Sequence, residues 1–269
     1  MKKILYTPNW KENLEKNNTS FRNPIFFLRY IGDEMIIKTS LFNSTTNDLT
    51  IVIDLLRAST TITVALNNFN KVIPVNNDEK AFEIKKEHPD AILAGEKDLN
   101  TIEGYDITNS PEIIQEYSGD IFVINTTNGT KVIENIKNRD ENIIVLVGAG
   151  INARALAEKA LELATDEIEL IMAGRHENFN IEDAIGAGLI VDEIVNVAQE
   201  RNIDIVLDES ALASKLLAED KQKAKELIGT SWGGKKLSKI GLSGDVEICQ
   251  QLNTLDTVGL YENGEIRKI

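Results

Sequence analysis

Short apolar runs alternate with amphipathic stretches along most of the chain. Residues 51–55 form the clearest run, because Asp54 near its end is its only polar residue, and residues 58–67 follow with a helical pattern. Continuous apolar runs of this length are typical of strands that are buried on both faces. The pattern predicts strands at residues 36–39, 51–55, 72–75, 91–94, 121–124, 143–147 and 168–173.

Helical patterns separate and follow these strands. They lie at residues 58–67, 78–88, 111–117, 129–138, 151–164, 182–200, 207–228 and 244–252. Near the end of the chain, Asn263 and Gly264 stand between two short extended stretches, which predicts a hairpin over residues 257–269. Such an alternation of strands and helices is typical of an α/β fold. We therefore expect a single three-layer α/β/α domain over residues 35–269, with a largely parallel or mixed central sheet.

The first 34 residues have a different character. Residues 11–23 are polar, rich in Asn and Lys, and show no helical or strand period. We predict that residues 1–34 are an N-terminal extension. It is either a flexible arm or a segment that precedes a natural start at Met35.

The charge of the chain limits the classes of ligand. The chain has 29 basic and 43 acidic side chains, a formal net charge of −14. This balance argues against non-specific binding to nucleic acids or membrane surfaces, which requires positive potential. The single cysteine, Cys249, excludes an internal disulfide and fits a cytoplasmic protein. An anionic substrate would need cations, or a metal ion, that converge locally.

In open α/β sheets, ligands bind beyond the carboxyl ends of the strands. This rule selects the polar loops that follow the predicted strands at residues 54–61, 95–97, 125–131 and 174–183. The loop at 125–131 is the best candidate for phosphate, because it brings hydroxyl groups and a flexible Asn-Gly pair to the start of a helix. Its candidate residues are Thr126, Thr127, Asn128, Gly129, Thr130 and Lys131. The alternative is an ordinary turn in which one of these residues caps the helix.

Acidic residues in the same loops could hold a metal ion. The candidates are Asp54, Glu96, Asp183 and Asp208. Carboxylate oxygens are suited to Mg²⁺. Each of these positions can also be explained as a helix cap, and Asp54 could equally be a nucleophile.

Several other kinds of site are disfavoured. The only histidines are His88 and His176, too few for a multi-histidine zinc centre. Cys249 has no nearby arginine, so a thiolate phosphatase loop is missing. A Walker A motif is absent, and the glycines at 148–150 match a dinucleotide-binding loop only in part, which leaves an NAD-type oxidoreductase as a weak alternative.

Taken together, the loops resemble one known family. They read DLLRASTTI at residues 54–62, LAGE at 93–96, GYD at 104–106, NSP at 109–111, TTNGT at 126–130 and EDAIGAG at 182–188. Asp208, the GLxxD pattern at 241–245 and Cys249 continue the series. In this order the motifs resemble the 2-phosphosulfolactate phosphatase family. The similarity spans roughly residues 35–258, although Lys97 stands where the family usually has arginine.

The resemblance implies a Mg²⁺-dependent acid phosphatase that converts 2-phospho-3-sulfolactate to 3-sulfolactate in coenzyme M biosynthesis. We expect Asp54, Arg57 and Asp183 to be catalytic, with Mg²⁺ held by some of Asp54, Glu96, Asp183 and Asp208. The expected substrate-binding residues are Ser59, Thr60, Lys97, Asn109, Thr126, Thr127, Asn128, Gly129, Thr130, Lys131 and Arg175. Alternatives are a phosphatase for another small phosphorylated 2-hydroxy acid and a non-catalytic binder of such acids. The sequence does not determine the oligomeric state, and a homodimer would be unsurprising.

Overall fold

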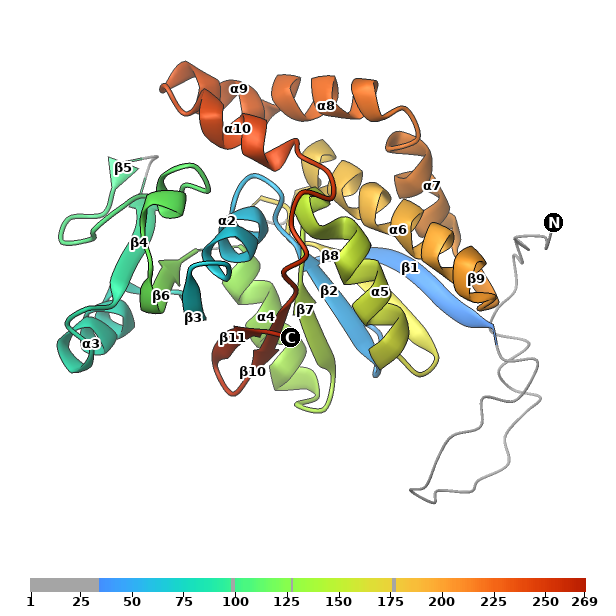
Figure 1. Ribbon diagram of the computed structural model, residues 1–269, viewed down its shortest axis with the longest axis horizontal. Coiled ribbons are helices and arrows are strands. Elements are labelled where there is room, and N and C mark those ends of the chain that lie inside the picture. Colours follow the sequence, from blue (N-terminus) through green and yellow to red (C-terminus); the bar gives the residue numbers. More distant parts are fainter. Residues whose placement is uncertain (1–33, 98–99, 127, 176–177) are drawn as a thin grey trace.

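The computed structural model describes residues 34–97, 100–126, 128–175 and 178–269 (Figure 1). The predicted N-terminal extension, apart from its last residue, lies outside the described residues. So do Thr127 and His176.

The described strands form one mixed sheet of 11 strands, in the order β5-β4-β6-β3-β11-β10-β7-β2-β8-β1-β9. Their bounds are β1 (Met35–Leu41), β2 (Leu49–Ile53), β3 (Phe69–Val75), β4 (Ile92–Lys97), β5 (Asn100–Thr101), β6 (Gly119–Asn125), β7 (Ile144–Val147), β8 (Glu167–Met172), β9 (Ile205–Leu207), β10 (Gly259–Glu262) and β11 (Glu265–Lys268). Parallel pairing dominates both halves of the sheet. The prediction of an α/β domain with a largely parallel or mixed sheet is confirmed.

Helices connect the strands and cover the sheet (Figure 1). They are α2 (Ala58–Ala65), α3 (Asp78–Glu87), α4 (Gly129–Arg139), α5 (Ala153–Leu163), α6 (Ile181–Arg201), α7 (Glu209–Leu217), α8 (Lys221–Thr230), α9 (Trp232–Lys239) and α10 (Ser243–Cys249), with 3-10 turns η1 (Ile113–Glu116) and η2 (Gly150–Asn152). Helices α8, α9 and α10 lie together over one end of the sheet, at the top of Figure 1. None of the described helices is both long and apolar enough to span a membrane.

The C-terminal hairpin has an unexpected position. Strands β10 and β11 are inserted between β7 and β3; β10 runs antiparallel to β7, and β11 runs antiparallel to β3. Gly259 pairs with Val147, and Ile266, which is fully buried, pairs with Val72. The last residues of the chain therefore join the two parallel halves of the sheet.

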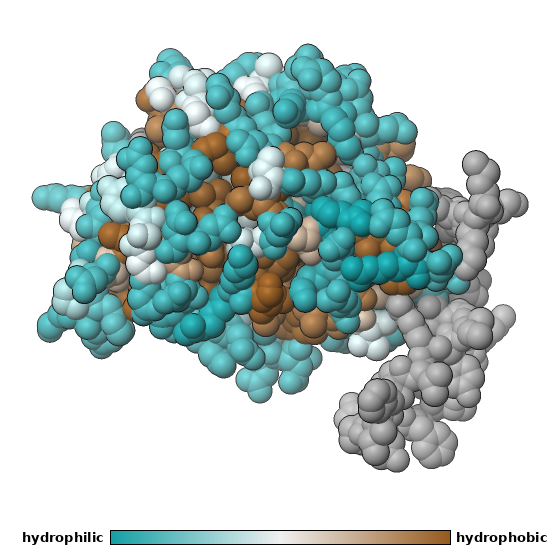
Figure 2. Space-filling model, in the orientation of Figure 1, coloured by the Kyte–Doolittle hydropathy of each residue, from teal (hydrophilic) through white to brown (hydrophobic). Residues whose placement is uncertain are grey.

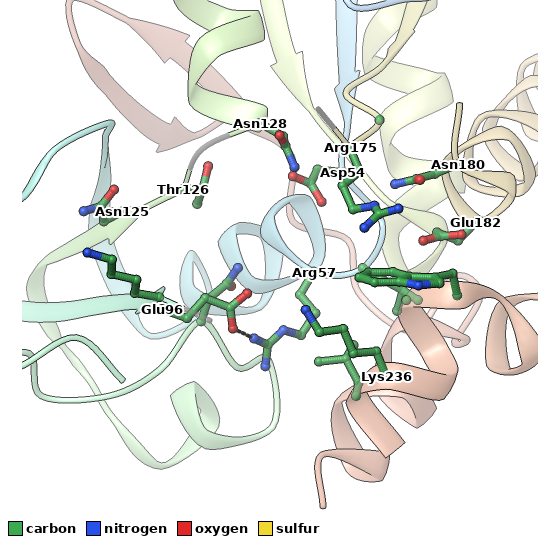
Figure 3. Close-up of a pocket in the computed structure, with 17 residues that line it drawn as sticks. Asp54, Arg57, Glu96, Asn125, Thr126, Asn128, Arg175, Asn180, Glu182 and Lys236 are labelled. Carbon is green, nitrogen blue, oxygen red and sulfur yellow. Dashed lines mark hydrogen bonds and ion pairs between the residues drawn. The ribbon is translucent and has the colours of Figure 1, made fainter. Parts of the chain in front are cut away.

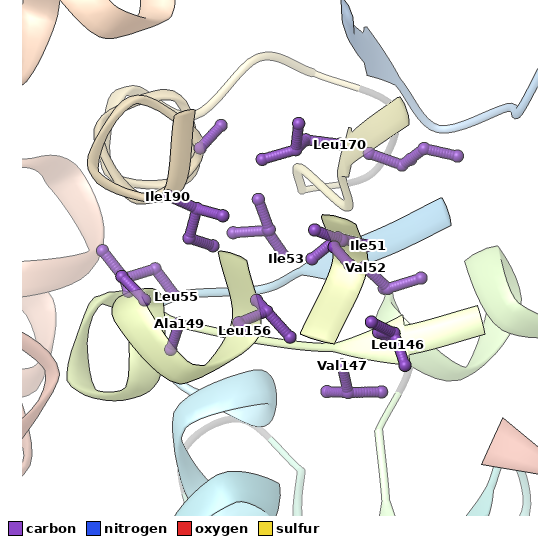
Figure 4. Packing of buried hydrophobic residues seen from close by; sticks show 14 of the residues in the cluster. Ile51, Val52, Ile53, Leu55, Leu146, Val147, Ala149, Leu156, Leu170 and Ile190 are labelled. Atoms are coloured by element: carbon purple, nitrogen blue, oxygen red, sulfur yellow. The ribbon is translucent and has the colours of Figure 1, made fainter. Parts of the chain in front are cut away.

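The main hydrophobic core lies around β2, β7 and β8. All five residues of β2 are buried, as the continuous apolar run predicts. Leu156 of α5 and Ile190 of α6 are fully buried and belong to this core together with Ile53 and Leu146 (Figure 4). This packing fixes the end of β2, which positions the first residue of the candidate site. Outside the core, hydrophilic residues cover most of the face in Figure 2.

Three expected helices differ from the structure. The helix expected at 207–228 is divided into β9, α7 and α8, and the break comes where Asp220 accepts hydrogen bonds from the N–H groups of Gln222 and Lys223. The helix expected at 111–117 is the shorter 3-10 turn η1, and the first residues expected in the helix at 151–164 belong to η2. Helix α9 was not predicted, because Gly233 and Gly234 disfavour a helix.

Candidate active site

A cleft of about 380 Å³ opens at the carboxyl ends of the central strands, between the loops that follow them and helix α9 (Figure 3). Its lining residues are Asp54, Leu56, Arg57, Glu96, Lys97, Asn109, Asn125, Thr126, Asn128, Gly174, Arg175, Asn180, Glu182, Trp232, Gly233, Lys236 and Leu237. This is the position where ligands bind in open α/β sheets.

Asp54 is the first residue after β2, and it lies at the floor of the cleft. The Ser59 hydroxyl bonds to the Asp54 carbonyl at 3.0 Å, and the Ser59 N–H bonds to the same carbonyl at 2.9 Å, so the turn into α2 is rigid. Burial raises the pKa of Asp54 to about 6, because hydrogen bonds from the Ala58 and Gly129 N–H groups only partly offset burial and the charges of Glu96 and Glu182. A cation or a proton would relieve this concentration of negative charge.

The start of α4 lies beside Asp54. Thr126 leaves β6 with its N–H bonded to the Val75 carbonyl at 3.1 Å, and its hydroxyl lies 3.1 Å from that of Thr130. Asn128 precedes the helix without capping it through its side chain, and Figure 3 shows that side chain next to Asp54. The free N–H groups and positive dipole of a helix start favour an anion there.

Arg57 lies between two acids, the partly exposed Glu96 and the buried Asp245. Its side chain is only 3% exposed and bonds to Glu96 on one side and to Asp245 of α10 on the other. Asp245 also accepts the Ser110 hydroxyl and the Glu112 N–H. Arg57 therefore holds β4, α10 and the loop before η1 together, and its charge is balanced by two carboxylates.

Three further cations line the cleft from separate parts of the fold. Lys97 ends β4, Arg175 follows β8, and Lys236 lies on α9. Among the described residues, no carboxylate forms an ion pair with any of them within 4.0 Å. With Arg57 included, four cations face the three carboxylates Asp54, Glu96 and Glu182. The cleft of this acidic protein is thus not acidic itself.

Glu182 closes the cleft near the start of α6. Burial raises its pKa, although its own N–H, the Ser231 hydroxyl and the charge of Arg175 oppose this. Ser231 also caps α9 by accepting the Gly234 N–H at 3.0 Å. A methyl group on Gly233 would come within 2.7 Å of a Glu182 carboxylate oxygen, so a larger residue here would displace the Glu182 side chain. Glu182 and Ser231 together fix α9 over the cleft.

Comparison with known proteins identifies the family. The profile of the 2-phosphosulpholactate phosphatase family matches residues 35–264. The chain belongs to this family. It is 38% identical over 232 residues to the 2-phosphosulfolactate phosphatase of Methanothermobacter thermautotrophicus, covering 86% of this chain and 95% of the relative. It is 34% identical over 227 residues to a probable 2-phosphosulfolactate phosphatase of Clostridium acetobutylicum, and 35% over 225 residues to one of Clostridium tetani. These matches cover 82% and 81% of this chain and 92% and 91% of the relatives. The prediction of a phosphoric monoester hydrolase is confirmed.

Many of the residues that the family resemblance nominated line one cleft. They are Asp54, Arg57, Glu96, Lys97, Asn109, Thr126, Asn128 and Arg175. Asn109 is 6% exposed, and its side-chain oxygen has no hydrogen-bond partner among the described residues. A buried polar atom of this kind at a cleft wall is suited to a ligand.

Other nominated residues lie beside the cleft rather than in its wall. Ser59, Thr60, Gly129 and Thr130 are buried behind it; the Thr60 hydroxyl donates to the Leu55 carbonyl at 2.9 Å. Lys131 is exposed on α4 and does not line the cleft. Of these groups, Gly129 bonds to the Asp54 carboxylate through its N–H, whereas Ser59 bonds to the Asp54 backbone.

Asp183 and Asp208 both accept backbone N–H groups and do not line the cleft. Asp183 is 1% exposed; its two carboxylate oxygens accept the N–H groups of Leu55 at 2.8 Å and Gly174 at 2.9 Å. Asp208 caps α7 by accepting the Ala211 N–H at 2.7 Å, and it is not part of the cleft wall. Burial and the charge of Asp54 both raise the pKa of Asp183, so Asp183 lies behind the cleft wall close to Asp54.

The family cleft also contains residues that the sequence analysis did not nominate. They are Asn125, Asn180, Glu182, Trp232 and Lys236. The rule of strand ends already selected the loops that hold the first three. Trp232 and Lys236 gave no such signal, because they lie on the unpredicted helix α9.

The donor set is suited to Mg²⁺ only in a limited way. No group of three or more His, Cys, Asp or Glu side chains in the described part of the chain could hold a metal ion. Mg²⁺, however, is commonly bound through one or two carboxylates, waters and the phosphate of the substrate. Asp54, which lies in the cleft with a raised pKa, fits that pattern.

Proposed function

We propose that this chain hydrolyses 2-phospho-3-sulfolactate to 3-sulfolactate and phosphate in a Mg²⁺-dependent reaction. The observation that carries the proposal is the convergence of Lys97, Arg175 and Lys236 on a cleft whose floor holds Asp54 and the start of α4. The names of the relatives support the same substrate. From the family resemblance we also expect the product to serve coenzyme M biosynthesis.

The phosphoryl group would bind between Asp54 and the start of α4. The Thr126 hydroxyl and the Asn128 amide are hydrogen-bond donors for its oxygens, and the positive end of the α4 dipole favours the anion. Arg57 is less suited to this role than the sequence analysis expected, because two carboxylates already engage it. Its role would be to hold Glu96 at the edge of the cleft.

In the reaction, a water oxygen joins phosphorus, the bond between phosphorus and the C2 oxygen breaks, and that oxygen gains a proton. Asp54 would hold Mg²⁺ together with the substrate phosphate, with Glu96 or Glu182 as the second carboxylate. When bound, Mg²⁺ would neutralise charge on the phosphoryl oxygens and on the departing oxygen. Asp183 would keep the Leu55 and Gly174 N–H groups, and so the walls beside Asp54, in place.

An alternative role for Asp54 is direct attack on phosphorus to give an acyl phosphate, which water then hydrolyses. Acid quenching during turnover, followed by mass spectrometry of the peptide that contains Asp54, distinguishes the two routes. A phosphorylated Asp54 would establish the covalent route, and its absence under every quench would leave Asp54 as the metal ligand.

The test of the proposal is phosphate release from racemic 2-phospho-3-sulfolactate with Mg²⁺ and with EDTA, beside phospholactate and phosphoglycolate. We expect Mg²⁺-dependent release that favours the sulfonate. Asp54→Asn should lower kcat by at least about 10³-fold, and Lys131→Ala, which removes an exposed lysine of α4 outside the cleft, serves as the control. Phosphate release from phospholactate or phosphoglycolate alone would show that the enzyme is a phosphatase for a different substrate. No phosphate release from any of the three compounds would favour a non-catalytic binding protein.

A further inference from the structure

Helix α9 supplies an aromatic ring and a lysine to the cleft. Trp232 and Lys236 are one helical turn apart and therefore lie on the same face of α9. The Trp232 ring is 54% exposed, at the rim of the cleft. The Lys236 amine lies 4.8 Å from the centre of this ring, and the central carbon of the Arg175 guanidinium lies 3.6 Å from it. Two cations from distant segments thus share one indole ring.

The positive charges of Arg175 and Lys236 are not balanced by an ion pair among the described residues, so both can attract an anionic ligand. Neither forms an ion pair with a carboxylate among the described residues, whereas Arg57 forms two. The Nε atom of Arg175 is buried and has no hydrogen-bond partner in the described part of the chain. Glu182, a buried acid of the cleft, interacts with the charge of Arg175 without forming an ion pair with it among the described residues.

Arg175 and Lys236 lie together on one side of the cleft. Figure 3 shows Arg175 and Lys236 in one half of the cleft and Glu96 and Asn125 in the other half, with Asp54 and Asn128 between. A ligand whose phosphate lies at Asp54 would therefore extend a second group toward Arg175 and Lys236.

We propose that Arg175, Trp232 and Lys236 form a subsite for the sulfonate of the substrate and make this group the main determinant of specificity. This inference rests on the proposed function. A sulfonate is permanently ionised and, like the guanidinium group of arginine, weakly hydrated, so the two lose little by leaving water together. The indole holds the flat face of the guanidinium and leaves its N–H edge free for the sulfonate oxygens. Lys236 adds a second positive charge from the facing helix.

The first test compares two substrates that differ only in the sulfonate. Phospholactate has a methyl group where 2-phospho-3-sulfolactate has a sulfonatomethyl group. We expect Lys236→Gln to lower kcat/KM for the sulfonate substrate by about 10- to 100-fold and for phospholactate by less than about threefold. Lys235→Gln changes the neighbouring exposed lysine, which does not line the cleft, and should affect neither. An equal loss on both substrates, or no loss on either, would overturn the subsite.

The second test measures binding without catalysis. The chain has two tryptophans, so Trp10→Phe leaves Trp232 as the only fluorophore of its kind. We expect 3-sulfolactate to change its emission in a saturable manner, lactate to do so only at much higher concentration, and Lys236→Gln to weaken the response to 3-sulfolactate.

The two tests separate failure of the subsite from failure of the proposed function. A saturable response that prefers 3-sulfolactate, without phosphate release, would support the subsite and reject the phosphatase. Phosphate release with no preference of Trp232 emission for 3-sulfolactate over lactate would retain the phosphatase and reject the subsite.

Discussion

Asp183 gives the sharpest test of how the fold supports the cleft. It is buried at the start of α6, and each carboxylate oxygen accepts one backbone N–H, from Leu55 after β2 and from Gly174 after β8. Asp183→Ala would leave both buried N–H groups without an acceptor, at about 1–3 kcal/mol each. We therefore expect the free energy of unfolding to fall by about 4 kcal/mol. Asp183→Asn keeps one acceptor and should cost about half as much.

Urea unfolding without added metal measures this effect. For a slope of about 2–3 kcal/mol/M, the midpoint of Asp183→Ala should fall by about 1–2 M. Asp208→Ala is the matched control, because it removes a helix cap outside the cleft, where Asp208 accepts the Ala211 N–H and the Ser210 hydroxyl, and it should cost about 1–2 kcal/mol with activity retained. Asp183→Asn should keep the Mg²⁺ concentration for half-maximal activity, since Asp183 does not line the cleft. An unchanged urea midpoint for Asp183→Ala, combined with a large increase in that Mg²⁺ concentration, would refute the structural role and restore Asp183 as a metal ligand.

Three further predictions concern protonation and packing. Protons compete with Mg²⁺ for Asp54, because burial raises the pKa of this carboxyl to about 6. The Mg²⁺ concentration for half-maximal phosphate release should therefore rise as the pH falls through 6. A constant Mg²⁺ concentration from pH 5 to 8 would contradict this prediction. Burial raises the pKa of Glu169, but hydrogen bonds from Ser44 and Thr46 and the charge of Lys38 outweigh it and lower the pKa overall. In urea unfolding, the wild type should therefore be more stable than Glu169→Gln above pH ~4.5, and this difference should disappear at lower pH. A difference that does not depend on pH would show that the charge of Glu169 does not contribute to stability. Gly188→Ala would place a methyl group 1.9 Å from the Ser214 carbonyl oxygen, so α6 and α7 must separate. Thermal unfolding should show that the free energy of unfolding falls by about 3 kcal/mol or more. A Tm equal to that of the wild type would disprove this close packing.

Local patterns predicted most of the sheet because each strand carries its own signal. The continuous apolar run of β2 predicts a strand that is buried on both faces, and in the structure all five residues of β2 are buried in the main core. The position of the C-terminal hairpin has no comparable signal. Asn263 and Gly264 specify a turn, but the insertion of β10 and β11 between β7 and β3 depends on pairing with residues more than a hundred positions away.

The candidate site was predictable where it follows the strands. The loops after β2, β4, β6 and β8 supply Asp54, Glu96, Thr126 and Arg175, because the parallel pairs β2–β8 and β4–β6 each end at a common edge and both of these edges face the cleft. The sequence could not separate an aspartate that faces a ligand from one that accepts backbone N–H groups. The local sequence around Asp183 fits a metal ligand and a helix cap equally well. Its contacts with backbone N–H groups depend on how α6 packs against the ends of β2 and β8, which the sequence does not reveal.

The charge of the cleft explains why helix α9 matters for function. Arg57 is the cation that the sequence points to most strongly, yet Glu96 and Asp245 neutralise it, so it adds little net attraction for an anion. The cleft cations that form no ion pair with a described residue come from the end of β4, the loop after β8 and α9. In a chain with a net charge of −14, removing the α9 lysine would leave only Lys97 and Arg175 against Asp54 and Glu182 once the Arg57–Glu96 pair is discounted. Binding of the sulfonate-bearing substrate should therefore depend on Lys236 more than on the ion-paired arginine, although only Arg57 stands in a recognisable motif.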